Sequence, residues 1–456
     1  MAKNMTEGKP LKLILTFMVP VLCGGLFQNF YNIADSMIVG RFLGVDALAS
    51  VGSTTYVNFF VVGWILGITS GFSILIAQAF GAGDKKRLKH FMAMSVYVCI
   101  FFAVVMTIGL ILVNEWILRA INIPVNIFDM TSGYIRIIYA GLPITILYNM
   151  LAATARALGD SKTPLYFLII SSLLNIALDI LFVAALPFGV PGAALATVIS
   201  QGVSAVLCLI YVGKKYEIIR FGREDSKFSV QSIWELLKMG VPMGLQFSIT
   251  ALSGMIVQSS LNMLGETYIA SYTAANKIQN VILQAYPSLG TAMATYVGQN
   301  YGAGKYDRIK KGVSTSVLIA GMYSIITMTA AYFFLAPMVQ IFAEDPTGQL
   351  QEIAGQMLHI CLWFYFPLGL IFIYRNTLQG LGNGLVPMLG GIFELIARAA
   401  AVRILFEPFQ FAGICMTDPA AWISALIPLI PYYYWYIHKK LKTESKAKHA
   451  GEIKAV

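Results

Sequence analysis

The chain has 456 residues, of which 57% are hydrophobic and only 12% are charged, and its formal net charge is +10. Soluble proteins carry roughly 25% charged residues, so this composition excludes an ordinary water-soluble globule, and the apolar content excludes a disordered chain. Five cysteines in so long a chain do not make a disulfide scaffold. The mean hydropathy of +0.71 indicates a polytopic membrane protein.

Long apolar stretches follow one another from end to end of the chain. Each exceeds the ~20 residues that a helix needs to cross a bilayer, and is far longer than the ~10 residues of a membrane barrel strand. We therefore expect an all-α protein with twelve transmembrane helices. They are predicted at 13–40, 48–79, 90–113, 130–154, 163–186, 189–212, 234–264, 268–299, 312–338, 350–380, 385–406 and 411–437.

Basic residues concentrate in every second connection between these stretches, as at Lys85–Lys86–Arg87 and at Lys214–Lys215. Because Lys and Arg in short loops stay on the cytoplasmic side, this pattern places both termini in the cytoplasm of a protein of the plasma membrane. The charges are spread over six short segments and not gathered on one face. Topology therefore explains the net charge better than nucleic-acid binding does.

The sequence contains an internal repeat. AQAFGAGDKKRLKH at 77–90 pairs with GQNYGAGKYDRIKK at 298–311 at an offset of 221, ALGDSKTP at 157–164 pairs with GLGNGLVP at 380–387 at 223, and Pro20 pairs with Pro242 at 222. Each copy holds an even number of spans, so the copies share one orientation and a pseudo-two-fold axis along the membrane normal. We predict an N-lobe at 1–212, a cytoplasmic linker at 213–232, a C-lobe at 233–440 and a basic cytoplasmic tail at 441–456.

Motifs for enzymatic chemistry are missing. The phosphate-binding pattern GxxxxGK[ST] is absent, since GAGK at 302–305 is followed by Tyr306, and we interpret the glycines of this string as helix caps. The four histidines are too scattered for a metal cluster, and there is no GxSxG motif. We therefore expect no enzyme and no cofactor.

Charged residues inside the predicted spans are the most informative side chains, because an ionised group at the membrane centre costs roughly 3 kcal/mol. Asp179 follows Asn175 by four residues, and Asp35 follows Tyr31 by four, so each pair shares one helix face. Two carboxylates with an amide and a hydroxyl would form an oxygen site for Na⁺ or for a proton. The alternative is that Asp35 and Asp179 make helix-cap or interlobe hydrogen bonds.

The second half carries more intramembrane charges. Glu394 and Arg398 are four residues apart, which predicts an intrahelical ion pair, and Arg375 is expected to reach the membrane surface as an anchor. Lys277 would either complement a substrate anion or neutralise an acid. Pro20, Pro143, Pro242 and Pro367 lie inside spans, where each gives a fixed bend or a hinge.

Several motifs together resemble the multidrug and toxic compound extrusion (MATE) family over essentially the whole chain. They are QNFYNIADSMIVGRFLG at 28–44, the paired QxxGAG loops, ARALGDSKTP at 155–164, NIALD at 175–179, GVPGAALAT at 189–197 and GGIFELIAR at 390–398. The resemblance is closer to DinF-like and MepA-like bacterial members than to NorM. It implies two six-helix lobes and a cation site in the N-lobe at Asp35, Asn175, Asp179 and Thr197, with Na⁺ or H⁺ as the ion. Tyr31, Tyr139 and Asn149 would be its neighbours.

The C-lobe departs from the NorM pattern of a seventh-helix Glu and a tenth-helix Asp. The seventh helix has Gln246, Gln258 and Asn262 instead, and the tenth has Asn376. Together with Lys277, Glu394 and Arg398, these residues are candidate substrate contacts. We therefore place coupling in the N-lobe.

The resemblance implies an antiporter that exports cationic or amphipathic small molecules in exchange for H⁺ or Na⁺, and we expect it to be a monomer. The alternative transport function is a flippase for lipid-linked precursors or polysaccharides. A membrane receptor or scaffold that transports nothing is the alternative from another class.

Overall fold

The computed structural model describes residues 3–186, 188–340 and 348–454, so residues 1–2 and 187 of the predicted N-lobe, 341–347 of the predicted C-lobe and 455–456 of the predicted tail fall outside them. The described residues are almost entirely helical and contain no strand. The first half contains α1 (Pro10–Leu43), α2 (Val45–Ser53), α3 (Thr55–Gly81), α4 (Lys85–Ala120), α5 (Val125–Ala140), α6 (Leu142–Ala157), α7 (Lys162–Asp179), the π-helix η1 (Ile180–Ala185), α8 (Gly189–Lys215) and the 3₁₀ turn η2 (Glu217–Ile219). The second half contains α9 (Val230–Leu261), η3 (Asn262–Leu264), α10 (Glu266–Leu283), α11 (Ala285–Gly302), α12 (Tyr306–Gln340), α13 (Gln349–Leu362), α14 (Tyr365–Gly380), α15 (Leu385–Cys415) and α16 (Thr417–Lys454).

Ten of the predicted spans are long and apolar enough to cross a membrane among the described residues. Eight are single helical segments, and two are the pairs α5–α6 and α13–α14, which bend by 46° and 52°. The other two predicted spans, 268–299 and 411–437, are helical as α10–α11 and α16, but they fall short of this criterion. The mean hydropathy of 268–299 is lowered by its polar residues, and that of 411–437 by its Pro, Tyr and Trp residues. The prediction of a polytopic helical membrane protein is confirmed.

The predicted prolines mark two kinds of place. Pro143 and Pro367 lie in the first turn of α6 and α14, directly after the two bends. Backbone N–H groups in a first turn have no acceptor within the helix, so proline costs no helical hydrogen bond there. Pro20 and Pro242 lie inside the continuous helices α1 and α9.

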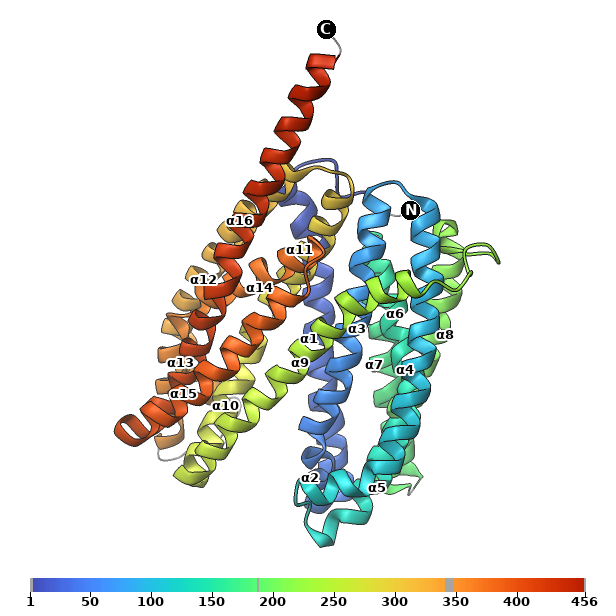
Figure 1. The fold of residues 1–456 in the computed structure, drawn as a ribbon. Helices are drawn as coiled ribbons and strands as arrows, with labels where there is room; N and C mark the ends of the chain where they lie inside the picture. Colours follow the sequence, from blue (N-terminus) through green and yellow to red (C-terminus); the bar gives the residue numbers. More distant parts are fainter. Residues whose placement is uncertain (1–2, 187, 341–347, 455–456) are drawn as a thin grey trace. The chain divides into compact units, whose positions relative to one another are not determined.

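The chain divides into two compact units. The first unit holds Val19–Gly244 with the chain up to Asn4, and the second holds Met5–Met18 with the chain from Leu245 onwards. In the first unit α3, α4, α6, α7 and α8 run side by side, and in the second α15 packs on α16 and α11 on α14 (Figure 1). The backbone thus passes between the units inside α1 and inside α9, close to Pro20 and Pro242.

The repeat is visible in the helix ends. Gly83 and Gly304 have φ of 71° and 69°, and Gly159 and Gly382 have φ of 81° and 87°, a region that glycine adopts without steric cost. At each of these ends the N–H of the residue after the glycine donates to the carbonyl five residues earlier, as Asp84 N does to Ala79 O at 3.1 Å and Lys305 N to Asn300 O at 2.8 Å. This is the Schellman pattern, so the helix-cap interpretation of the GAG glycines is confirmed.

The second copy of the QxxGAG segment has an additional role in the second unit. Gln299 Oε1 accepts from Met5 N at 2.8 Å, Asn300 Nδ2 donates to Met5 O at 3.2 Å, and Lys305 Nζ donates to Thr6 O at 3.0 Å. Arg308 Nη2 donates to Met5 O at 3.3 Å and to Gly8 O at 3.0 Å. The segment therefore holds the N-terminal residues 5–8 through their backbone.

Candidate cation site

The first unit brings together the four residues predicted to form the cation site. Asn175 and Asp179 lie on α7, Thr197 lies on α8 and Asp35 lies on α1. With the Asn175 amide oriented to satisfy both of its ends, its nitrogen donates to Asp179 Oδ2 at 2.9 Å and its oxygen accepts from Thr197 N at 3.2 Å. Asp179 is 0% exposed and Asn175 is 1% exposed, so the amide ties α7 to α8 in a buried place.

Asp35 completes the site from α1. Its carboxyl group lies within electrostatic reach of that of Asp179, and the Tyr31 hydroxyl, one turn earlier, lies within electrostatic reach of both carboxyl groups. Asp35 Oδ1 and Asp179 Oδ1 are buried without a hydrogen-bond partner, and neither carboxylate forms an ion pair within the described part of the chain. A buried carboxylate without a counter-charge is costly, so the donor set fits a bound cation.

The backbone changes at this site. Asp179 is the last residue of α7, and the chain continues directly into the π-helix η1, a form that often marks functional sites. The Asp179 side chain makes no cap hydrogen bond there. The helix-cap alternative therefore has no support for Asp179.

The neighbours of the site differ in part from the predicted ones. Tyr134 of α5 was not predicted, yet it lies within electrostatic reach of Asp35, Tyr31 and Asp179. Tyr139 is fully buried with a hydroxyl that has no partner in the described residues, and Asn149 donates to Thr145 O on its own helix at 2.8 Å. Of the predicted neighbours, only Tyr31 has a described contact with the four site residues.

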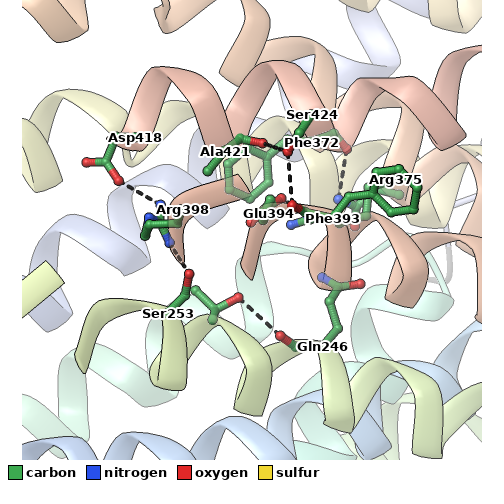
Figure 2. Close-up of polar contacts among 12 residues, drawn as sticks. Gln246, Ser253, Phe372, Arg375, Phe393, Glu394, Arg398, Asp418, Ala421 and Ser424 are labelled. Atoms are coloured by element: carbon green, nitrogen blue, oxygen red, sulfur yellow. Dashed lines mark hydrogen bonds and ion pairs between the residues drawn. The ribbon is translucent and has the colours of Figure 1, made fainter. Parts of the chain in front are cut away.

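Two ion pairs in the second unit overturn two predictions (Figure 2). Glu394 of α15 pairs with Arg375 of α14, and Arg398 pairs with Asp418 of α16 at 2.6 Å. The intrahelical pair predicted for Glu394 and Arg398 is therefore wrong, because each finds its partner on a neighbouring helix. Arg375 is only 7% exposed, so the prediction that it reaches the membrane surface is also wrong. Each of these four charges has an oppositely charged partner on a neighbouring helix, which offsets the cost of its desolvation.

The remaining candidates of the second unit are more dispersed. Gln246 Oε1 accepts from Gln379 Nε2 at 3.1 Å, whereas Gln258 Nε2 donates to Asn262 Oδ1 at 2.9 Å on an exposed surface. Asn376 donates to the Phe372 carbonyl of its own helix at 2.8 Å. Lys277 is exposed on α10 and has no ion pair within the residues that the structure covers.

Sequence reasoning missed three residues of this region: Ser253, Gln379 and Asp418. Arg398 Nη1 donates to Ser253 Oγ at 2.5 Å. Asp418 lies inside the predicted span 411–437, so the cost of an intramembrane charge could have identified it. Elsewhere in the described chain, no three His, Cys, Asp or Glu side chains gather as metal ligands would.

A duplicated set of membrane-spanning helices with a buried carboxyl pair defines a class, the duplicated helical membrane transporters. The MatE family model matches the chain twice, at residues 20–181 and 242–404, so the matches begin at Pro20 and Pro242 and the duplication is confirmed. The chain belongs to the MatE family, that is, to the multidrug and toxic compound extrusion (MATE) transporters.

Individual relatives agree with this assignment. The chain is 31% identical over 435 residues to "Probable multidrug resistance protein YoeA" of Bacillus subtilis (strain 168), covering 93% of each chain. It is 24% identical to "Multidrug export protein MepA" of Staphylococcus aureus (strain NCTC 8325 / PS 47), covering 87% of this chain and 86% of that one. A crystal structure of MATE in complex with MaL6 has the same fold, with a TM-score of 0.90 at 22% identity over 96% of this chain and 99% of that one.

Proposed function

We propose that the chain is a secondary active antiporter that exports cationic or amphipathic organic compounds in exchange for H⁺ or Na⁺. The coupling ion would bind at Asp35, Asn175, Asp179 and Thr197. The observation that carries the proposal is that two carboxyl groups of the first unit lie within electrostatic reach of each other, each with a buried oxygen that lacks a partner among the described residues. The names of the relatives, which refer to multidrug resistance and multidrug export, support the substrate class.

The carboxyl pair supplies a reason for coupling. Two carboxylates in contact cannot both remain charged in a buried site unless a cation neutralises part of their charge. A proton on either group, or Na⁺ held by carboxyl, amide and hydroxyl oxygens, would satisfy this requirement. Exchange follows if the cation and the substrate favour opposite-facing states of the transporter, because coupling requires only a difference in affinity between the two states.

The driving force is sufficient without ATP. One charge that crosses a potential of about 150 mV releases about 3.5 kcal/mol, which supports a substrate gradient of a few hundredfold.

We further propose a monomer in the plasma membrane, with both termini in the cytoplasm and small molecules as its substrates. The alternation of basic connections supports this orientation.

Ethidium efflux from proteoliposomes tests the proposal, with a Na⁺ gradient and a proton gradient imposed separately. We expect one gradient to drive efflux and Asp35→Asn to abolish it. Asp129→Asn is the matched control, because Asp129 is an exposed carboxylate of the same unit and should leave efflux unchanged. Folded protein without flux under either gradient would contradict antiport and favour the flippase alternative, and full flux in Asp35→Asn would contradict the site.

A further inference from the structure

The charged network around Arg398 occupies the place in its repeat that the cation site occupies in the first repeat. Arg398 follows Asn175 by 223 residues, the same offset that separates the starts of α7 and α15 at Lys162 and Leu385. Ser253 follows Tyr31 by 222 residues, the offset between Pro20 and Pro242 in the same pair of helices. Tyr31 and Asn175 in the first repeat therefore correspond to Ser253 and Arg398 in the second, and both pairs come from equivalent helices.

The residue types at these matched positions have opposite charge. At the same two offsets, Asp35 corresponds to Val257 and Asp179 corresponds to Val402, so the second repeat lacks both carboxylates. The amide of Asn175 is replaced by the guanidinium of Arg398. The site in the first repeat thus has two carboxylates and no basic side chain. The matching site in the second repeat has the basic side chain of Arg398 and no carboxylate at those two positions.

The guanidinium is held as a bound cation would be. Arg398 is 8% exposed; its Nη1 donates to Ser253 Oγ at 2.5 Å and its Nη2 donates to Asp418 Oδ1 at 2.6 Å (Figure 2). Asp418 comes from the first turn of α16. One hydroxyl and one carboxylate oxygen therefore coordinate the positive group from two different helices.

The charge balance of the two places also differs. Asp35 and Asp179 have no ion pair among the described residues, whereas Asp418 is paired with Arg398 and Glu394 with Arg375. An exchangeable cation would lower the energy of the first site, but would meet a permanent positive charge in the second. Arg is suited to this role because it stays charged at every physiological pH.

We infer that Arg398 is a covalently attached substitute for the coupling cation, so that the second unit binds no exchangeable cation and ion exchange is confined to the first unit. That the exchange takes place in the first unit rests on the proposed function. The occupation of the second site by Arg398 does not, and it can be tested without any transport.

The test uses purified full-length protein carrying Asp35→Asn and Asp179→Asn, so that the first site contributes nothing. Thermal unfolding is measured in Na⁺ and in choline, and over a range of pH around neutrality. In this double variant, which retains Arg398, we expect a further Asp418→Asn substitution to shift the unfolding midpoint by the same amount in Na⁺, in choline and at each pH. With Arg398→Asn, which gives the second repeat the amide of the first, the effect of Asp418→Asn should depend on Na⁺ or on pH.

Two further variants keep this test decisive if Arg398→Asn folds poorly. Arg398→Lys retains a fixed charge and should show no cation dependence, and Arg398→Asn with Asp418→Asn removes both charges and should unfold independently of Na⁺. The inference is overturned if the Asp418-dependent shift varies with Na⁺ or pH while Arg398 is present. It is equally overturned if the Arg398→Asn protein shows no dependence on either. Because efflux is not measured, failure of the antiport proposal would appear only in the proteoliposome experiment.

Discussion

Gly67 of α3 approaches Gly244 of α9 so closely that a β-carbon on Gly67 would lie 2.5 Å from the Gly244 Cα atom. The next turn repeats the contact, since a β-carbon on Gly71 would lie 2.5 Å from the Gly240 Cα atom. Both helices thus present glycines four residues apart, which lets the two backbones meet inside the first unit.

Replacing Gly67 by Val should separate α3 from α9, because backbone atoms cannot move aside as a side chain can. We expect a loss of about 3 kcal/mol in stability, seen as a lower midpoint of thermal unfolding in detergent. Gly109→Val is the matched control, because a β-carbon at Gly109 of α4 meets no atom within 4 Å. Equal midpoints for the two variants would show that the close approach is not required.

Asp160 lies in the loop between α6 and α7 and links the start of α7 to the end of α8. Its carboxylate accepts from Lys215 Nζ at 2.7 Å, from Thr163 Oγ1 at 2.5 Å and from the Tyr216 hydroxyl. Burial alone would raise its pKa, but these hydrogen bonds outweigh burial and hold the pKa of Asp160 below its usual value. The charged form is therefore the one that stabilises the folded protein.

This lowered pKa predicts a specific acid sensitivity. The contribution of Asp160 should be complete above the pKa of an unfolded Asp, about 4, and be lost as pH falls towards the lower folded value. At neutral pH, Asp160→Asn should cost roughly 2 kcal/mol, and the difference from wild type should shrink below pH of about 4. Thermal unfolding across pH measures this, and a difference that grows in acid would contradict it.

The N-terminal segment gives a prediction that compares the two repeats. Arg308→Ala removes two hydrogen bonds to the backbone of Met5 and Gly8, which should expose residues 5–8 more often. We expect a glutamate-specific protease to cleave after Glu7 roughly tenfold faster, since about 1.4 kcal/mol of local stability is lost. Arg87→Ala is the control, because Arg87 has the same place in the first repeat but pairs with the surface residue Glu235 at 3.3 Å. Unchanged cleavage in Arg308→Ala would refute this role.

The parts of the structure that follow a local rule could be predicted from the sequence. The spacing of Asn175 and Asp179 places them on one helix face, and the GAG strings predict helix ends that the structure has. Adding Thr197 to the site required the family motif, because nothing local relates α7 to α8. The partner of Glu394 could not be predicted either: Arg398 is near in sequence, but Arg375 on α14 forms the ion pair. The approach of Gly67 to Gly244 likewise depends on a helix distant in sequence.

The Arg375–Glu394 pair allows the cost of a buried charge to be measured directly. Glu394→Gln leaves Arg375 buried without its counter-charge, so we expect a loss of about 3–5 kcal/mol in stability. Replacing both residues by Met removes the pair together, and this double variant should be close to wild type. Arg403 and Glu407 form an exposed pair at 3.2 Å on the same helix, and Glu407→Gln should cost less than about 1 kcal/mol. Thermal unfolding of the four proteins decides the point: if Glu394→Gln and Glu407→Gln lose equal stability, then burial does not set the strength of the inner pair.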